Sequence, residues 1–247
     1  MKTKEMSIIK LAIYDWKQVG LSGKWAFPFI LLLSYLGFSY TMAPAGVLNS
    51  FSMSAYVLFL LMMSLGLIVD AIDHRMIDAA LLVKCGENQE RFYLAKMISV
   101  GIYAFIGTVI GMAMPCIRYA LDGTGFFIRA FTAGDVLTGI LIHILFGLSG
   151  GFFGLLLNHR IFSKRPLAIA VGAMIAVVSI LKIPIEQVTG WTKYILWIFP
   201  PISELEVAYG TADHVAADQM IYFFGMFVYC LLEGILYVWI MKRIKVR

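Results

Sequence analysis

Six long apolar runs constrain what this chain can fold into more than any other feature of its sequence. Each run has roughly 17–22 residues, about the number of helical residues that cross the hydrocarbon core of a bilayer. None has the alternation of polar and apolar residues that a membrane β-barrel requires. Lipid offers no partners to free backbone groups, so spanning runs of this kind must be helical. The sequence therefore predicts an all-α integral membrane protein with six transmembrane helices.

The composition excludes a soluble domain. Of the 247 residues, 61% are hydrophobic and only 14% are charged, whereas a soluble domain has about a quarter charged residues. The basic residues are scattered and form no stripe interleaved with aromatic residues, so nucleic acid is not an expected partner. The N-terminal residues lack an apolar run followed by a small-residue cleavage site, and we predict no removable signal peptide.

The six runs give the predicted spans. Their bounds are residues 25–42, 53–69, 97–117, 136–157, 167–183 and 220–241. Residues 1–24 mix lysines with an apolar set around Trp16, which favours an amphipathic interfacial helix, with a frayed basic tail as the alternative.

Lys and Arg lie mostly on one side of the predicted membrane. Sixteen of the 20 precede the first span, follow the sixth, or lie in the loops after the second and fourth spans. Only Arg118, Arg129, Lys182 and Lys193 fall on the other side. Because basic residues are retained on the cytoplasmic side, both termini are predicted to be cytoplasmic, with the chain crossing the cell membrane several times.

The loop between the second and third spans, Asp70 to Lys96, is the most polar segment of the chain. An apolar stripe with helical spacing runs from Ile72 to Val83, and a polar helix begins after Gly86. A solvated connector would not need a continuous stripe, so we predict two short helices that form a cytoplasmic elbow. Its candidate partner-facing residues are His74, Arg75, Asp78, Lys84, Glu87, Glu90 and Arg91.

The segment 184–219, between the fifth and sixth spans, contains a short apolar stretch from Tyr194 to Ile202. That stretch cannot cross a hydrocarbon core of about 30 Å. Pro200 and Pro201 interrupt it, which favours a re-entrant or interfacial hairpin on the outer side, with a plain loop as the alternative. The residues that mark this hairpin are Tyr194, Trp197, Pro200 and Pro201.

Two ionisable residues, His143 and Glu233, fall inside predicted spans. Such residues are costly in lipid and face the protein interior or water. They line a translocation path or serve as structural hydrogen-bonding groups. Glycine pairs four residues apart, such as Gly150 and Gly154, permit close helix approach. We expect them to pack within the chain, with a dimer interface as the alternative.

The sequence contains no recognisable catalytic constellation. The stretch from Gly20 to Trp25 lacks the spacer and the Ser or Thr of a phosphate-binding loop, so no ATPase is expected on this chain. The four histidines are dispersed, and no metal site is predicted. The three cysteines are far apart and do not indicate a disulfide framework.

Taken with these features, the chain resembles the permease subunits of type-2 ABC exporters, in particular the compact bacterial kind. The resemblance rests on the six spans, on Asp78 to Leu82 followed by a glycine turn and by Lys96, and on the stretch from Tyr194 to Pro201. The turn here is Cys85-Gly86, where many members have a turn containing proline.

The resemblance implies a single permease domain over residues 1–247, with the 70–96 segment acting as the coupling helix. It implies a non-enzymatic subunit that exports a peptide, an antibiotic or a lipid-like substrate. ATP and magnesium would bind to a separate ABC subunit, and a second or homologous permease copy would complete the transporter.

Two other classes of function stay open from the residues alone. One is a self-contained ion-coupled carrier or intramembrane enzyme that uses His143 and Glu233. The other is a scaffold or sensor subunit.

Overall fold

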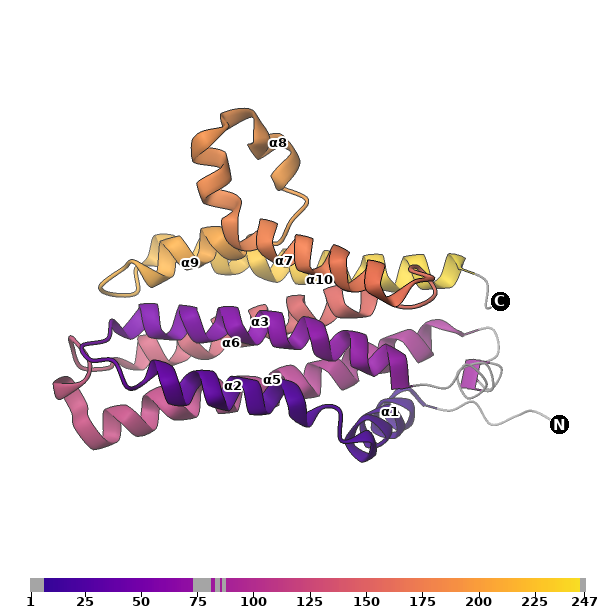
Figure 1. Cartoon of the computed structure of the whole chain (residues 1–247), viewed down its shortest axis with the longest axis horizontal. Coiled ribbons are helices and arrows are strands. Elements are labelled where there is room, and N and C mark those ends of the chain that lie inside the picture. The colour runs from indigo at the N-terminus through magenta and orange to yellow at the C-terminus, as the bar shows by residue number, and fades with distance from the viewer. Residues whose placement is uncertain (1–6, 73–80, 83–84, 86–87, 245–247) are drawn as a thin grey trace.

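The structure is a computed structural model of the chain, and it describes residues 7–72, 81–82, 85 and 88–244. These residues are almost entirely helical, and an isolated bridge between Ala45 and Phe127 is the only β-type pairing among them (Figure 1). The predicted all-α class is confirmed. The α-helices are α1 Ile8–Ser22, α2 Ala26–Ser39, α3 Val47–Ile72, α5 Glu90–Asp122, α6 Ala133–Leu156, α7 Arg165–Val188, α8 Lys193–Leu196, α9 Ile202–Gly210 and α10 Met220–Arg243. Short 3-10 turns are η1 Gly123–Gly125, η2 Gly190–Thr192 and η3 Ala217–Gln219.

In the described part of the chain, five helices are long and apolar enough to cross a membrane: α3, α5, α6, α7 and α10. The protein is therefore a membrane protein. A sixth span exists only if α1 and α2 count as one, and these helices are bent by 70° at the break between them. The first predicted span is the one that no single long helix matches, because α2 has 14 residues instead of the 18 expected over 25–42.

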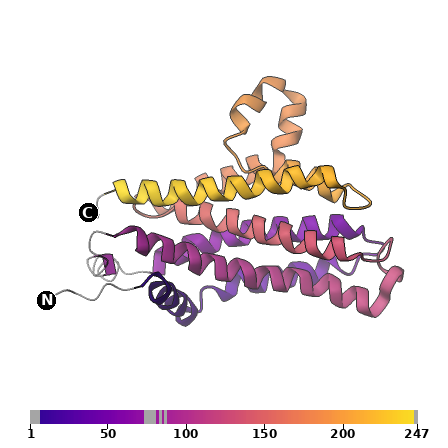
Figure 2. The ribbon, with the colours of Figure 1, turned by 180° about the vertical axis from the view of Figure 1, so that it is seen from behind.

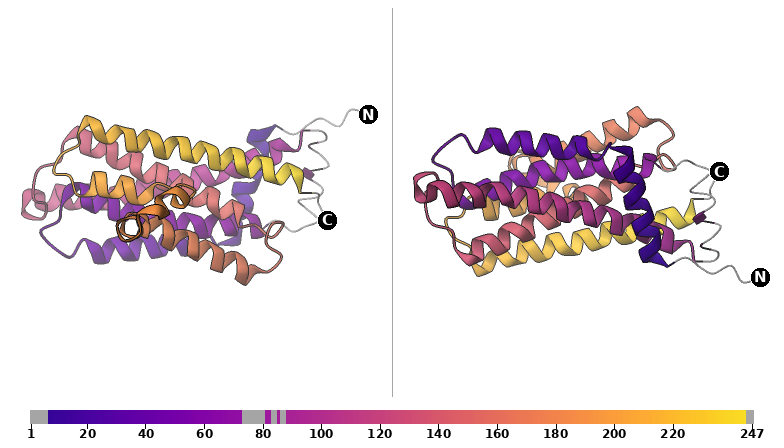
Figure 3. Two further views of the ribbon diagram at one scale, coloured as in Figure 1. Left: turned by 90° about the horizontal axis from the view of Figure 1, so that it is seen from above. Right: turned by 90° about the horizontal axis from the view of Figure 1, so that it is seen from below.

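Helix α1 lies across one end of the bundle, whereas the long helices run along it (Figure 3, right). It begins at Ser7, whose hydroxyl accepts a hydrogen bond from the Lys10 amide at 3.4 Å. It ends at Gly23, whose φ of 67° lies in the left-handed region that favours glycine. One face, which includes Leu11 and Val19, is buried against the bundle. The helix predicted within residues 1–24 is confirmed.

Helices α3 and α6 form the centre of the bundle and touch through glycines. A methyl group at Gly150 would lie 2.2 Å from the Phe59 carbonyl oxygen, and one at Gly154 would lie 2.2 Å from that of Met63. Only glycine permits this backbone approach. The prediction that Gly150 and Gly154 pack within the chain is confirmed.

The last turns of α7, together with η2 and α8, project sideways from the bundle as an arm (Figure 1). Figure 3 (left) looks along this arm. Pro184 lies inside α7 and deprives the Ile180 carbonyl of its helical donor, which weakens the helix where the arm begins. Because α7 continues to Val188, it is longer than the predicted span 167–183.

The start of α1 and the end of α10 lie at the same end of the bundle (Figure 2). The end of α3 and the start of α5 lie there too. We call this the Asp70 end, after the residue of α3 that lies there, and the other the Asp135 end.

Candidate functional site

A buried group of charged side chains lies at the Asp70 end, where α3 stops and α5 starts. Asp70 Oδ1 is 3.7 Å from Lys96 Nζ. The side chains are only 5% and 3% exposed, respectively. These two residues begin and end the charged segment of the sequence, so an ion pair joins the two ends of that segment.

His159, in the connection between α6 and α7, contacts the second carboxylate oxygen of Asp70. Its ring Nδ1 and its backbone amide lie 2.8 Å and 3.3 Å from Asp70 Oδ2. Asn158 holds this connection in place, because its side-chain oxygen accepts hydrogen bonds from the amides of Arg160 and Ile161. Both carboxylate oxygens of Asp70 therefore have partners.

Arg160 extends the contacts to two further helices. Its guanidinium donates to the Tyr93 hydroxyl at 3.0 Å. The Tyr93 ring packs edge-on against the ring of Tyr237 in α10, with 6.0 Å between the ring centroids. We call Asp70, Lys96, His159, Arg160 and Tyr93 the Asp70 cluster; it links α3, α5, the α6–α7 connection and α10.

Charged groups are expensive inside a membrane protein. Removing an ion from water costs several kcal/mol even after the protein relaxes. Ionisable residues within or at the end of spans are therefore rare and mark places with a function. The Asp70 cluster meets this description and is our candidate functional site.

The structure describes only two of the residues that are predicted to face a partner. His74, Arg75, Asp78, Lys84 and Glu87 lie outside the described residues. Glu90 and Arg91 are described at the start of α5. The Glu90 carboxylate forms an ion pair with Lys242 of α10, and both side chains are about half exposed. The structure thus places Glu90 and Lys242 at the Asp70 end, beside the Asp70 cluster.

His143 is fully buried and lies away from this cluster, in α6. Its Nε2 is 2.9 Å from the Ser54 hydroxyl of α3, and its Nδ1 is 2.7 Å from the Gly139 carbonyl oxygen. Both ring nitrogens therefore have hydrogen-bond partners.

Glu233 of α10 is also buried. Its Oε1 accepts a hydrogen bond from the Ser149 hydroxyl of α6 at 2.9 Å, whereas its Oε2 has no hydrogen-bond partner among the described residues. No hydrogen bond or ion pair joins Glu233 to His143 in the described part of the chain. The two candidate path residues thus belong to separate contacts.

The marker residues of the predicted outer hairpin fall on the arm and on its return to the bundle. Tyr194 and Trp197 are 71% and 67% exposed, whereas Pro200 is buried. Pro201 precedes α9, which packs against α7. An ion pair between Lys182 and Glu204 and a 3.4 Å hydrogen bond from the Ile183 amide to the Ser203 hydroxyl hold α7 and α9 together.

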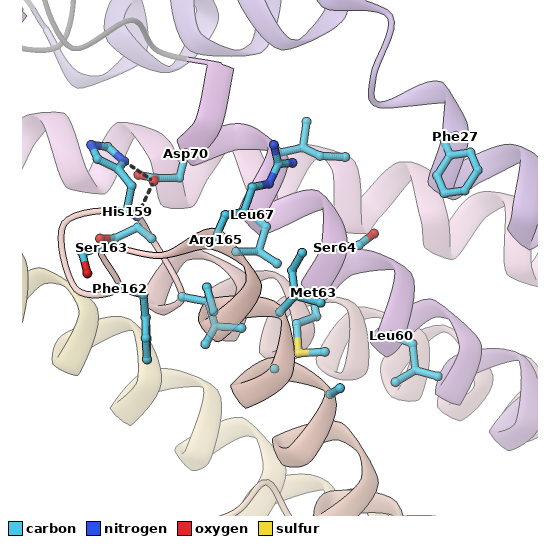
Figure 4. A pocket seen from close by; sticks show the side chains of 17 residues that line it. Phe27, Leu60, Met63, Ser64, Leu67, Asp70, His159, Phe162, Ser163 and Arg165 are labelled. Atoms are coloured by element: carbon cyan, nitrogen blue, oxygen red, sulfur yellow. Dashed lines mark hydrogen bonds and ion pairs between the residues drawn. The ribbon is translucent and has the colours of Figure 1, made fainter.

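A groove of about 490 Å³ adjoins the Asp70 cluster, between α3, α7 and the start of α2. Figure 4 shows Asp70, His159 and Ser163 on one side of it and Phe27 and Leu60 on the other. Sequence patterns gave no sign of this groove, because its walls come from distant parts of the chain.

The described residues contain no group of three or more His, Cys, Asp or Glu side chains that could hold a metal ion. In comparisons with known proteins, no family model, no curated protein and no solved structure matches this chain.

Proposed function

We propose that this chain is the permease subunit of a type-2 ABC exporter and works with a separate ATP-binding subunit. The observation that carries the proposal is the ion pair between Asp70 and Lys96. A coupling segment can transmit force only if both of its ends are fixed to the spans that must move. Asp70 lies in the last turn of α3 and Lys96 near the start of α5, so their ion pair holds the two ends of the segment, and the two helices, together.

The contacts of the Asp70 cluster suggest how movement spreads. A partner that closes on ATP pushes on the 70–96 segment and displaces Asp70 and Lys96 together. His159 transfers this displacement to the α6–α7 connection, and Arg160 and Tyr93 transfer it toward α10. Charged residues at the segment orient docking more than they supply affinity.

The remaining parts of the proposal follow from the resemblance and from the distribution of charge. The Asp70 end faces the cytoplasm of a bacterial cell. The arm leaves the bundle in the half that lies toward the outer face of the membrane. Two permease copies, or one copy and a homologous permease, form the path. The cargo is a peptide, an antibiotic or a lipid-like molecule.

The test is reconstitution with a candidate ATP-binding protein, such as one encoded by a neighbouring gene. We expect copurification and export from proteoliposomes that requires ATP and magnesium. Charge reversal at Glu87 and Arg91 should abolish both. The double variant Asp70→Asn/Lys96→Met should retain copurification but lose export, because it removes the link between segment and spans. Unchanged export in both variants would contradict the proposal.

A second candidate, an ion-coupled carrier, is favoured by one observation: Oε2 of buried Glu233 has no hydrogen-bond partner among the residues that the structure describes. A buried carboxyl group with a free oxygen is suited to proton exchange. Transport under a proton or sodium gradient by the purified chain, without any ATP-binding protein, would select this alternative.

A further inference from the structure

We propose that the groove beside the Asp70 cluster binds one acyl chain of an anionic phospholipid, with the phosphate held by Arg165. This inference needs only a membrane around the protein and does not depend on the proposed transport function. The volume of the groove, about 490 Å³, lies within the range of about 300–1,000 Å³ for small-molecule sites.

The walls of the groove suit a hydrocarbon chain. Leu60, Met63 and Leu67 of α3 face Ala168, Gly172 and Ala173 of α7. Phe27 and Ile169 line the groove and are 64% and 54% exposed, so it opens on the lipid-facing side of the bundle. Gly172 packs closely against Leu157, which also lines the groove, since a methyl group at Gly172 would come within 2.7 Å of a terminal carbon of Leu157.

The length of the groove matches one leaflet. From Asp70 to Leu60 an α-helix rises about 15 Å at 1.5 Å per residue. This is about half of a hydrocarbon core of about 30 Å. A chain that enters from the adjacent leaflet would therefore place its headgroup at the Asp70 end.

The polar end of the groove carries an unbalanced positive charge. Asp70 is already bound by Lys96 and His159. Arg165, at the first position of α7, makes no side-chain hydrogen bond or ion pair with any described residue, and neither does the side chain of Ser163. A guanidinium and a hydroxyl at the mouth of an apolar groove complement a phosphate diester. Basic pockets between spanning helices bind anionic headgroups in this way.

The test is native mass spectrometry of the purified chain in detergent with phosphatidylglycerol or with phosphatidylcholine of the same acyl chains. We expect one tightly bound phosphatidylglycerol and weaker binding of phosphatidylcholine. Arg165→Gln should weaken phosphatidylglycerol binding about fivefold, and phosphatidylcholine binding by less, because the choline cation already offsets the phosphate charge of phosphatidylcholine. Arg243→Gln, at the exposed end of α10, is the matched control and should retain the preference.

A second pair of variants tests the apolar part. Ala173→Phe fills the groove and should reduce binding of both lipids, whereas Ala170→Phe alters an exposed position of the same helix outside the lining. Equal losses in Arg165→Gln and Arg243→Gln would show general surface attraction and overturn the proposal. Unchanged binding in Ala173→Phe, with an unaltered melting temperature, would also overturn it.

Discussion

Asp70 and Lys96, which begin and end the charged segment, meet as a buried ion pair with 3.7 Å between Oδ1 and Nζ. The pair joins the end of α3 to the first turns of α5. It leaves the segment between them attached at two points that cannot separate without exposing a buried charge.

Removing one partner of this pair should be costly. Lys96→Met leaves the Asp70 carboxylate with His159 alone, and we expect a loss of about 3–5 kcal/mol in the free energy of unfolding. The double variant Asp70→Asn/Lys96→Met should recover most of this loss, because no uncompensated charge stays buried. Denaturant unfolding in detergent measures both values.

The control for this experiment is Lys242→Met, which removes the half-exposed pair with Glu90. Exposed pairs contribute about 0–1 kcal/mol. Equal effects of Lys96→Met and Lys242→Met would show that burial does not set the strength of the Asp70–Lys96 contact.

The glycine contacts between α3 and α6 predict a sharp contrast between two similar substitutions. Gly150→Ala should destabilise the protein by about 1–3 kcal/mol, because its methyl group meets the Phe59 carbonyl. Gly225→Ala in α10 has nothing within 4 Å and should be neutral or should stabilise by up to about 1 kcal/mol. Melting temperatures in one detergent compare them, and a loss of equal size in both would refute close packing.

Glu206 of α9 predicts a pH-dependent effect. Burial raises the pKa of the Glu206 carboxyl above its usual value of 4.5. The folded state therefore binds the proton more tightly than the unfolded state, and Glu206 reduces stability as pH rises from 4.5 through its folded pKa. Glu206→Gln should melt at a higher temperature than the wild type at pH 8, and the difference should shrink toward pH 4. A difference that stays constant across this range would contradict the prediction.

Glu233 separates the two candidate functions. Glu233→Gln keeps an oxygen that accepts from Ser149, so we expect stability within about 1 kcal/mol of the wild type and retained ATP-dependent export. Glu233→Leu removes the acceptor and should cost about 1–3 kcal/mol. If Glu233→Gln folds normally but loses transport, the carboxyl group takes part in ion coupling.

The helical class and the places of five long helices could be predicted from the sequence because hydrophobicity over a span is a local property. The predicted bounds of the spans are less accurate than their order. Helix α3 begins at Val47 and not at residue 53, because Ser50, Ser52 and Ser54 donate their hydroxyls to carbonyls one turn earlier. These bonds keep polar residues inside a helix that a hydropathy pattern ends too soon.

The Asp70 cluster could be predicted only in part. The sequence marks Asp70 and Lys96 as the ends of a polar segment, and Lys96 is one of the basic residues that predict the orientation in the membrane. Its burial follows from contact with Asp70, which no local pattern encodes. His159 was one dispersed histidine among four, and only the packing of α3 beside α6 brings it to Asp70.

The backbone contact between α3 and α6 also limits how the protein can change shape. At Gly150 and Gly154 the backbone of α6 lies directly against that of α3, so these two positions leave no room for one helix to slide past the other. We therefore expect the two helices to move together. Because Ser54 lies in α3 and His143 in α6, the hydrogen bond between them should stay intact when a displacement at Asp70 moves the two helices together.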